Sequence, residues 1–322
     1  MNYRCTLLLL IFYCPFFFGQ DVHWSLPLQN PIGLNPSNVG DFKGDFRIIS
    51  NYKDQWRSVT KPFNTINLSF DKKVNNLFSL GSTLIHDITG DGKYRTIDLN
   101  ILPSYSLIAK NNRKLTLGVS LGIIYKQITP ANFKFDNQFD GYMYQENLSS
   151  NEAFQSASQL NMNIGAGLSF NFNQHTIGLS FFNLNQPNQG FFNTLINRPI
   201  RFLFNYQTHL NQNGRFQYTP SFVVQKQSVY TEVITGLKSS YQINNKKLRS
   251  IILGLNVRFK DAIIPHIGLE FNNLKTGIGY DINTSSLNLA SRSRGGTELY
   301  LQYIFVKPTI KNLEHRKCKD FL

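Results

Sequence analysis

Apolar and polar residues alternate along most of the chain with a period of two. The clearest example is the run LNMNIGAGLSFNF at residues 160–172, where every second residue is apolar and the residues between are Asn, Gly or Ser. Successive side chains of a β-strand point to opposite faces, so this run predicts a strand with one apolar and one polar face. The run is longer than an ordinary strand of roughly 5–6 residues and is typical of a tilted strand that crosses a membrane.

The same alternation recurs in TGIGYDIN at 276–283 and in TELYLQYIF at 297–305. In both runs the acidic residues, Asp281 and Glu298, fall on the polar face, as expected where the other face meets lipid. Counting such runs predicts fourteen strands, and a bacterial single-chain barrel requires an even number. The expected ranges are 45–56, 63–72, 77–86, 94–109, 113–126, 160–172, 175–184, 198–210, 214–226, 229–242, 248–260, 262–272, 274–283 and 297–306.

The connections between the expected strands differ in length. Tight polar turns are expected at 173–174, 211–214 and 244–247, a long loop at 127–159, and intermediate loops at 185–197 and 284–296. Short turns at one end and longer loops at the other are typical of outer-membrane barrels. We therefore predict an all-β fold, an antiparallel outer-membrane β-barrel of about 14 strands. A soluble β-sandwich stays the alternative, since fourteen strands could also bury their apolar faces against one another.

The first nineteen residues, MNYRCTLLLLIFYCPFFFG, are typical of a secretory signal peptide, so we assign 1–19 to a leader. Arg4 supplies positive charge before an apolar stretch that is too short to span a bilayer as a helix. Cys14 would suit a lipoprotein, but bulky residues precede it where a lipoprotein signal has small ones. Removal of the leader leaves only Cys318, which excludes an internal disulfide. No later stretch has the length and apolarity of a membrane-spanning helix.

Composition and charge agree with an exported β protein. Aromatic residues make up 14% of the 322 residues and charged residues only 16%, while Asn and Ser are plentiful. The net charge of +14 would favour lipopolysaccharide, peptidoglycan or an acidic partner. Because the basic residues are spread thinly and form no Lys/Arg block, nucleic-acid binding is not supported.

No motif for enzymatic or metal chemistry stands out. The histidines have no metal-ligand spacing; they are His23, His86, His175, His209, His266 and His315. The stretch DITGDGKYRTID at 87–98 matches part of a calcium-binding EF-hand loop, but it contains two basic residues and lacks the final Glu, so a polar hairpin tip explains it better. We therefore predict no catalytic residue, no cofactor and no metal. A barrel hydrolase stays a lesser alternative, because serine is too abundant for a Ser/His/acid match to be informative.

The segment LQNPIGLNPSNVG at 28–40 contains two Asn-Pro pairs. It is too Pro-rich for a regular helix and too irregular for a strand. The prolines fix their φ angles, and the amides of the two Asn residues are suited to bonding nearby backbone in Asx-type turns. We therefore expect residues 20–43 to form a plug or latch before the barrel at 44–306, with a simple linker as the alternative. The candidate residues for this role are Asn30, Pro31, Asn35, Pro36 and Gly40.

The chain continues beyond the last expected strand with KPTIKNLEHRKCKDFL at 307–322, which contains five Lys or Arg residues against two acidic ones. We predict a basic periplasmic tail. It is either solvated or a docking segment for a periplasmic partner. The candidates for docking are Lys311, Arg316 and Lys317.

Several stretches together resemble the PorP/SprF family of type IX secretion system outer-membrane proteins of Bacteroidetes. NPIGLNPSNVG is similar to the Asn-Pro segment that opens these proteins, and NYKDQW followed by PFNTINLSFDK resembles their first hairpin. HDITGDGKYRTIDLNILPSYSLIA resembles the family's third hairpin. HTIGLSFFNLNQP resembles a strand exit, and GIGYDINTSSLNLASRSRGGTELYLQYIF resembles the closing hairpin. The resemblance extends over roughly 20–306, apart from the N-terminal half of the loop at 127–159.

This resemblance implies a non-enzymatic outer-membrane component that assists export or surface attachment of large proteins with a C-terminal signal, such as gliding adhesins. The partners it implies are the secretion machinery, an adhesin-type substrate and an OmpA-like peptidoglycan-binding periplasmic protein, besides outer-membrane lipid. A passive porin or ligand-transporter barrel stays the alternative. Such a barrel would be expected to have charged rings in its lumen rather than the Asn/Gly/Ser lining that the sequence predicts.

Overall fold

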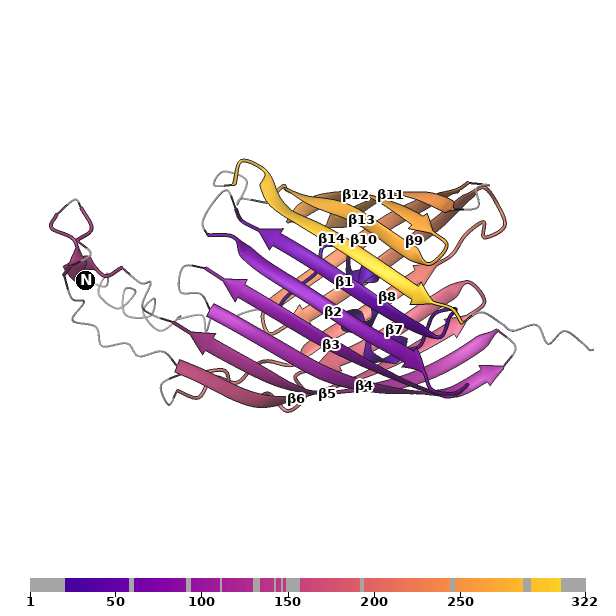
Figure 1. Cartoon of the computed structure of the whole chain (residues 1–322), viewed down its shortest axis with the longest axis horizontal. Coiled ribbons are helices and arrows are strands. Elements are labelled where there is room, and N and C mark those ends of the chain that lie inside the picture. Colours follow the sequence, from indigo (N-terminus) through magenta and orange to yellow (C-terminus); the bar gives the residue numbers. More distant parts are fainter. Residues whose placement is uncertain are drawn as a thin grey trace, which may run out of the picture.

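The computed structural model describes residues 21–57, 61–90, 94–110, 112–129, 134–141, 143–145, 147–148, 157–191, 194–243, 247–285 and 291–307. The described residues fold into a closed barrel of fourteen antiparallel strands (Figure 1). The strands are β1 (Phe46–Gln55), β2 (Phe63–Lys73), β3 (Phe78–Thr89), β4 (Tyr94–Lys110), β5 (Arg113–Ile128), β6 (Ala157–Phe172), β7 (His175–Phe182), β8 (Arg201–Thr208), β9 (Phe216–Gln227), β10 (Tyr230–Gln242), β11 (Leu248–Arg258), β12 (Ala262–Phe271), β13 (Leu274–Asn283) and β14 (Arg294–Phe305).

Each strand pairs with its neighbours in the sequence, and β1 closes the barrel by pairing with β14. The closing register runs from Phe46 opposite Phe305 to Gln55 opposite Gly296. Closure leaves no strand edge unpaired, which is the condition for a sheet to cross a bilayer. The predicted antiparallel barrel is confirmed, and the β-sandwich alternative is wrong, because the sheet closes on itself rather than facing a second sheet.

The two faces of the sheet differ as the alternation predicts. In β2, Ile66, Leu68 and Phe70 are exposed on the outside of the barrel, whereas Asn67 and Ser69 between them are buried inside. The outer face is therefore the apolar one, as lipid requires, and the polar side chains line the lumen.

The connections define the two ends of the barrel. At one end the turns are short, such as 173–174 and 272–273, whereas the other end carries the long connections 129–156 and 183–200. In outer-membrane barrels the short turns face the periplasm, so we call these the periplasmic and the extracellular end.

Among the described residues, four short helices lie outside the strands: η1 (Pro27–Gln29), α2 (Pro31–Leu34), η2 (Pro36–Asn38) and η4 (Asp136–Gln138). The first three follow one another ahead of β1 and are drawn in indigo within the barrel in Figure 1. No helix among the described residues has the length and apolarity to cross a membrane. The predicted leader lies outside the described residues.

Candidate functional site: an N-terminal segment inside the barrel

Residues 21–40, here called the N-terminal segment, lie inside the barrel. Asp21 lies at the extracellular end, where it contacts the β7–β8 connection and the start of β8. Gly40 lies at the periplasmic end, where its N–H donates to Asp71 near the end of β2. Most residues between them are buried. The segment therefore crosses the lumen from end to end before the chain enters β1.

The two Asn-Pro pairs begin two of its helices. Asn30 Oδ1 accepts the N–H of Gly33 at 3.2 Å and caps α2, whereas Asn35 Oδ1 accepts the N–H of Ser37 at 2.9 Å and caps η2. A proline follows each cap at the first helical position, where the missing N–H has no partner to lose and φ is already suitable. The repeated Asn-Pro pair thus encodes two consecutive capped turns rather than one continuous helix.

Asn35 also fastens the segment to the barrel wall. Its Nδ2 donates to the carbonyl of Leu168 on β6 at 3.0 Å and to the carbonyl of Leu179 on β7 at 3.1 Å. The close approach requires a wall without side chains: a Cβ on Gly167 would overlap Asn35, and a Cβ on Gly118 would overlap the backbone of the segment. These glycines of β5 and β6 form a seat for η2.

We expect Gly118→Val to push the N-terminal segment off this seat. The added side chain meets backbone atoms, which have no rotamer to escape into, and overpacking of this kind costs about 1–3 kcal/mol. Amides of residues 31–40 should exchange with deuterium faster in this variant than in the wild type. Leu117→Val, on the lipid face of the same strand, is the matched control. Equally slow exchange in wild type and Gly118→Val would contradict a tightly packed seat.

A buried carboxylate holds the periplasmic end of the segment. Asp71 accepts Arg47 Nε at 2.9 Å, Arg47 Nη2 at 2.8 Å and the N–H of Gly40 at 2.7 Å. The same guanidinium donates to the carbonyl of Asn38 at 3.3 Å. Asp71 is wholly buried, and only 4% of Arg47 is exposed. Two strands and the end of the segment are thus joined by charge-assisted hydrogen bonds.

A second ion pair holds the extracellular end. Arg198 Nε donates to Asp21 at 2.6 Å, Asn183 Nδ2 donates to it at 2.9 Å, and Arg201 Nε lies 3.6 Å from the same carboxyl. Burial alone would raise the pKa of Asp21, but the two arginines outweigh burial and hold this pKa well below its usual range. Asp21 is therefore ionised at neutral pH and ties the segment to the β7–β8 connection.

Between these ends, strand side chains bond the backbone of the segment. The N–H of Ser25 donates to Glu298 at 2.6 Å, its hydroxyl donates to Asp281 at 2.8 Å, and Lys53 Nζ donates to the carbonyl of His23 at 2.9 Å. Burial lowers the pKa of His23, and the positive charge of Lys53 and of neighbouring arginines lowers it further. His23 is therefore neutral at neutral pH. With the contacts of Asp21 and Gly40, these bonds attach the segment at the extracellular end, in the middle and at the periplasmic end of the lumen.

The lumen carries more charge than the sequence predicted. The expected Asn, Gly and Ser lining is present in β6, and Asp281 and Glu298 face inward, as the alternation predicted. Lys53 and Arg258 add buried positive charge that the alternation did not identify. Many of these charges contact the N-terminal segment or one another. Charge in the lining therefore does not by itself separate a passive porin from other barrels, which corrects the expectation based on the cleanest runs.

A pocket of about 500 Å³ opens inside the lumen at the extracellular end. It lies between the N-terminal segment and the β7–β8 connection, and its walls combine aromatic with charged side chains, including Asp21, Tyr94, Lys126, Phe191 and Arg198. Lys126 Nζ donates to Gln189 of that connection at 2.8 Å. The segment thus forms part of this pocket and limits its depth.

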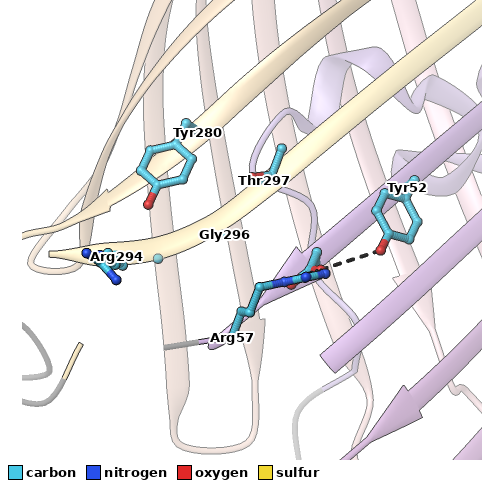
Figure 2. A pocket seen from close by; sticks show the side chains of 8 residues that line it. Tyr52, Arg57, Tyr280, Arg294, Gly296 and Thr297 are labelled. Atoms are coloured by element: carbon cyan, nitrogen blue, oxygen red, sulfur yellow. Dashed lines mark hydrogen bonds and ion pairs between the residues drawn. The ribbon is translucent and has the colours of Figure 1, made fainter. Parts of the chain in front are cut away.

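A second pocket, of about 410 Å³, lies between β1, β13 and β14 near their extracellular ends (Figure 2). Its lining includes Tyr52 and Thr297, which alternate with the inward-facing Lys53 and Glu298 and therefore face outward. Arg57 also lines this pocket and forms an ion pair with Asp54. Tyrosine and arginine side chains at this height suit the boundary between membrane and water. This pocket is separate from the lumen.

Residues 87–89 end β3 and residues 94–98 begin β4, and residues 91–93 of the predicted hairpin tip lie outside the described residues. Asp87 accepts the hydroxyl of Thr65 at 2.6 Å. Within the described ranges, no group of three or more His, Cys, Asp or Glu side chains could hold a metal ion. Lys311, Arg316 and Lys317 lie outside the described residues, so docking through the tail stays a prediction.

Sequence reasoning missed the charged anchors of the N-terminal segment. Asp21, Asp71 and Arg198 were not candidates, although a charged residue on the polar face of a barrel strand is a signal where charge is scarce. Asp71 carries that signal, since it continues the inward-facing series of β2. Asp21 lies outside the strands, where no periodicity marks it. Arg198 fell within the strand expected at 198–210, but β8 begins only at Arg201.

Comparison with known proteins places this barrel. A family model described as type IX secretion system membrane protein PorP/SprF matches residues 16–303. No curated protein matches the chain in sequence. Two solved structures share the fold at 10% identity: the toluene transporter TbuX of Ralstonia pickettii, over 85% of this chain and 93% of that one with a TM-score of 0.54, and the monoaromatic hydrocarbon channel CymD, over 87% and 93% with a TM-score of 0.53. Because the family match covers nearly the whole chain and the fold is an outer-membrane-type barrel, the protein belongs to the PorP/SprF family of type IX secretion system membrane proteins and is placed in the outer membrane.

Proposed function

We propose that this barrel is a non-enzymatic component that assists export or surface attachment of large proteins with a C-terminal signal, such as gliding adhesins. The observation that carries the proposal is the family match over residues 16–303. Association with the type IX machinery follows from family membership. The adhesin-type substrate and an OmpA-like peptidoglycan-binding partner, contacted through Lys311, Arg316 and Lys317, are the finer parts of the proposal.

We assign the N-terminal segment the role of an internal plug, shaped by Asn30, Pro31, Asn35, Pro36 and Gly40. Its buried ion pairs at both ends and its contacts with Glu298 and Asp281 support this role. A lumen closed in this way favours a barrel that binds and presents other proteins over one that conducts small solutes.

The alternative is a ligand-transporting barrel, since TbuX is a toluene transporter and CymD a monoaromatic hydrocarbon channel. An apolar ligand needs a mostly apolar path, because charged groups lose hydration when they line it. Here the lumen pocket includes Asp21, Lys126 and Arg198 among its walls. This lining favours the secretion role.

Deletion of the gene is expected to abolish the export or surface display of at least one protein with a C-terminal signal. Mass spectrometry of the medium, the cell surface and the periplasm should find that protein trapped in the periplasm, and the wild-type gene should restore it. Unchanged export of every such protein, together with intact gliding, would contradict the proposed function.

A further inference from the structure

At the periplasmic end, one wall of the lumen lies opposite the N-terminal segment. Helix η2 contacts β4, β5 and β6. In the ring of fourteen strands, β12 is seven strands from β5, so β12 and its neighbours lie on the side of the barrel opposite η2. Above this far wall, Leu26 of the segment packs against Ala262, Ile264 and Tyr300. We call the inward-facing side chains between Leu26 and the periplasmic end the periplasmic wall: Lys238, His266, Glu270, Lys275 and Tyr300.

Two lysines give the periplasmic wall an excess of positive charge. Lys238 on β10 and Lys275 on β13 both point into the lumen, in the periplasmic halves of their strands. Neither ammonium group forms an ion pair or a hydrogen bond with any described residue; Lys275 Nζ lies 5.8 Å from the centre of the Tyr300 ring. The acid beside them, Glu270, accepts the hydroxyl of Ser250 at 3.1 Å.

The same wall holds two buried polar groups without partners. His266 is 7% exposed and Tyr300 is 2% exposed, and neither ring nitrogen of His266 nor the hydroxyl of Tyr300 has a hydrogen-bond partner among the described residues. Unsatisfied buried groups are rare in folded proteins, because each loses its hydration without replacement. The side chains of His266 and Tyr300 and the two lysines are therefore hydrogen-bond donors without an acceptor among the described residues.

Glycines shape the surface on which these rings lie. A Cβ on Gly254 would overlap the ring of His266, and a Cβ on Gly268 would overlap the hydroxyl of Tyr300. The two rings therefore lie flat along β11 and β12 instead of reaching across the lumen.

We propose that the periplasmic wall binds the carboxylates of an acidic polypeptide segment that enters the barrel from the periplasm. Lys238 and Lys275 supply the charge, and Tyr300 and His266 supply neutral donors. Lipid phosphates are excluded as the ligand because these side chains face the lumen. The donors are spread from β10 to β14, so they suit several carboxylates on one chain better than a single small anion. The site does not depend on which protein the barrel helps to export.

The test uses the full mature protein in lipid nanodiscs and a fluorescent oligoglutamate peptide, with an oligoglutamine peptide as the uncharged comparison. Fluorescence anisotropy should show binding of oligoglutamate alone. Lys238→Gln and Lys275→Gln should each weaken it about tenfold, the effect of losing one charge-assisted hydrogen bond. Lys72 lies on the outer face of β2, near the periplasmic end of the barrel. Lys72→Gln is therefore the matched control and should leave peptide binding unchanged.

Tyr300→Phe removes only a hydroxyl that has no partner, so it should fold normally and still weaken peptide binding. Equal binding by the wild type and all lysine variants would overturn the site. If inorganic phosphate displaces the peptide at a concentration that supplies the same total negative charge, the claim that a polypeptide is the ligand is wrong. Either result would leave the proposed role in export untouched, because that role is read from the exported proteins.

Discussion

Deletion of residues 21–40 is expected to turn a barrel with a filled lumen into an open, conducting pore. No strand is lost, because β1 begins at Phe46, so the fourteen-stranded wall should still assemble. Barrel diameter grows with strand number, and a barrel of this size has room for water once its filling is removed, so single-channel conductance in planar bilayers should rise roughly tenfold or more. The wild type should conduct little, because the segment crosses the lumen and is anchored at both ends.

A milder variant tests the same idea without shortening the chain. Replacing both Asn30 and Asn35 with Ala removes two helix caps, each worth about 0.5–2 kcal/mol, and the bonds from Asn35 to the wall. We expect this variant to show brief channel openings whose conductance equals that of the variant without residues 21–40. A deletion variant that folds, as judged by its heat-modifiable migration on gels, but conducts no more than the wild type would contradict the plug.

The barrel could be predicted from the sequence because its signal is local and repeated. Alternation with a period of two identifies a strand and its faces without knowledge of any partner, and β13 begins and ends where the pattern predicted. Closure followed from an even strand count and from turns too short for any connection other than a hairpin. Strand ends were less certain, as at β14, which begins at Arg294 instead of residue 297.

The anchors could not be predicted, because their partners are distant in sequence. Alternation places Glu298 inside the lumen, but nothing in the pattern shows that it meets Ser25, which lies 273 positions away. The cleanest alternating runs also misled the prediction of the lining. Strands with few charges alternate most regularly, whereas charged inward positions such as Arg258 and Lys53 stand in runs with a weaker alternation of apolar and polar residues.

The glycines of β6 are a second case in which local alternation is not sufficient. The sequence placed Gly165 and Gly167 on the polar face, which is correct, but periodicity cannot tell a small residue that faces water from one that receives another part of the chain. Only the position of Asn35 against Gly167 shows that this glycine makes room for the N-terminal segment.

Replacing Asp71 with Leu is expected to destabilise the protein more than any other single change considered above. Arg47 would stay buried without its counter-charge, and the N–H of Gly40 would lose its acceptor. Removing one partner of a buried ion pair costs about 3–5 kcal/mol. Urea unfolding in lipid vesicles should show this loss, and Trp24, which is buried in the segment, reports its docking in a Trp56→Phe background.

The double variant Arg47→Met with Asp71→Leu separates the two roles of this pair. Replacing both charges with apolar side chains removes the unpaired cation, so the stability of the barrel should return to near the wild-type value. The N–H of Gly40 still lacks an acceptor, so the fluorescence of Trp24 should continue to report a loosened segment. Arg57→Met removes a guanidinium that is 74% exposed, so screening by water keeps the loss of its ion pair with Asp54 small; this variant is the control and should change neither quantity. If Asp71→Leu behaves like this control, the pair does not anchor the segment; if the double variant restores both quantities, the carboxylate acts only by balancing the charge of Arg47.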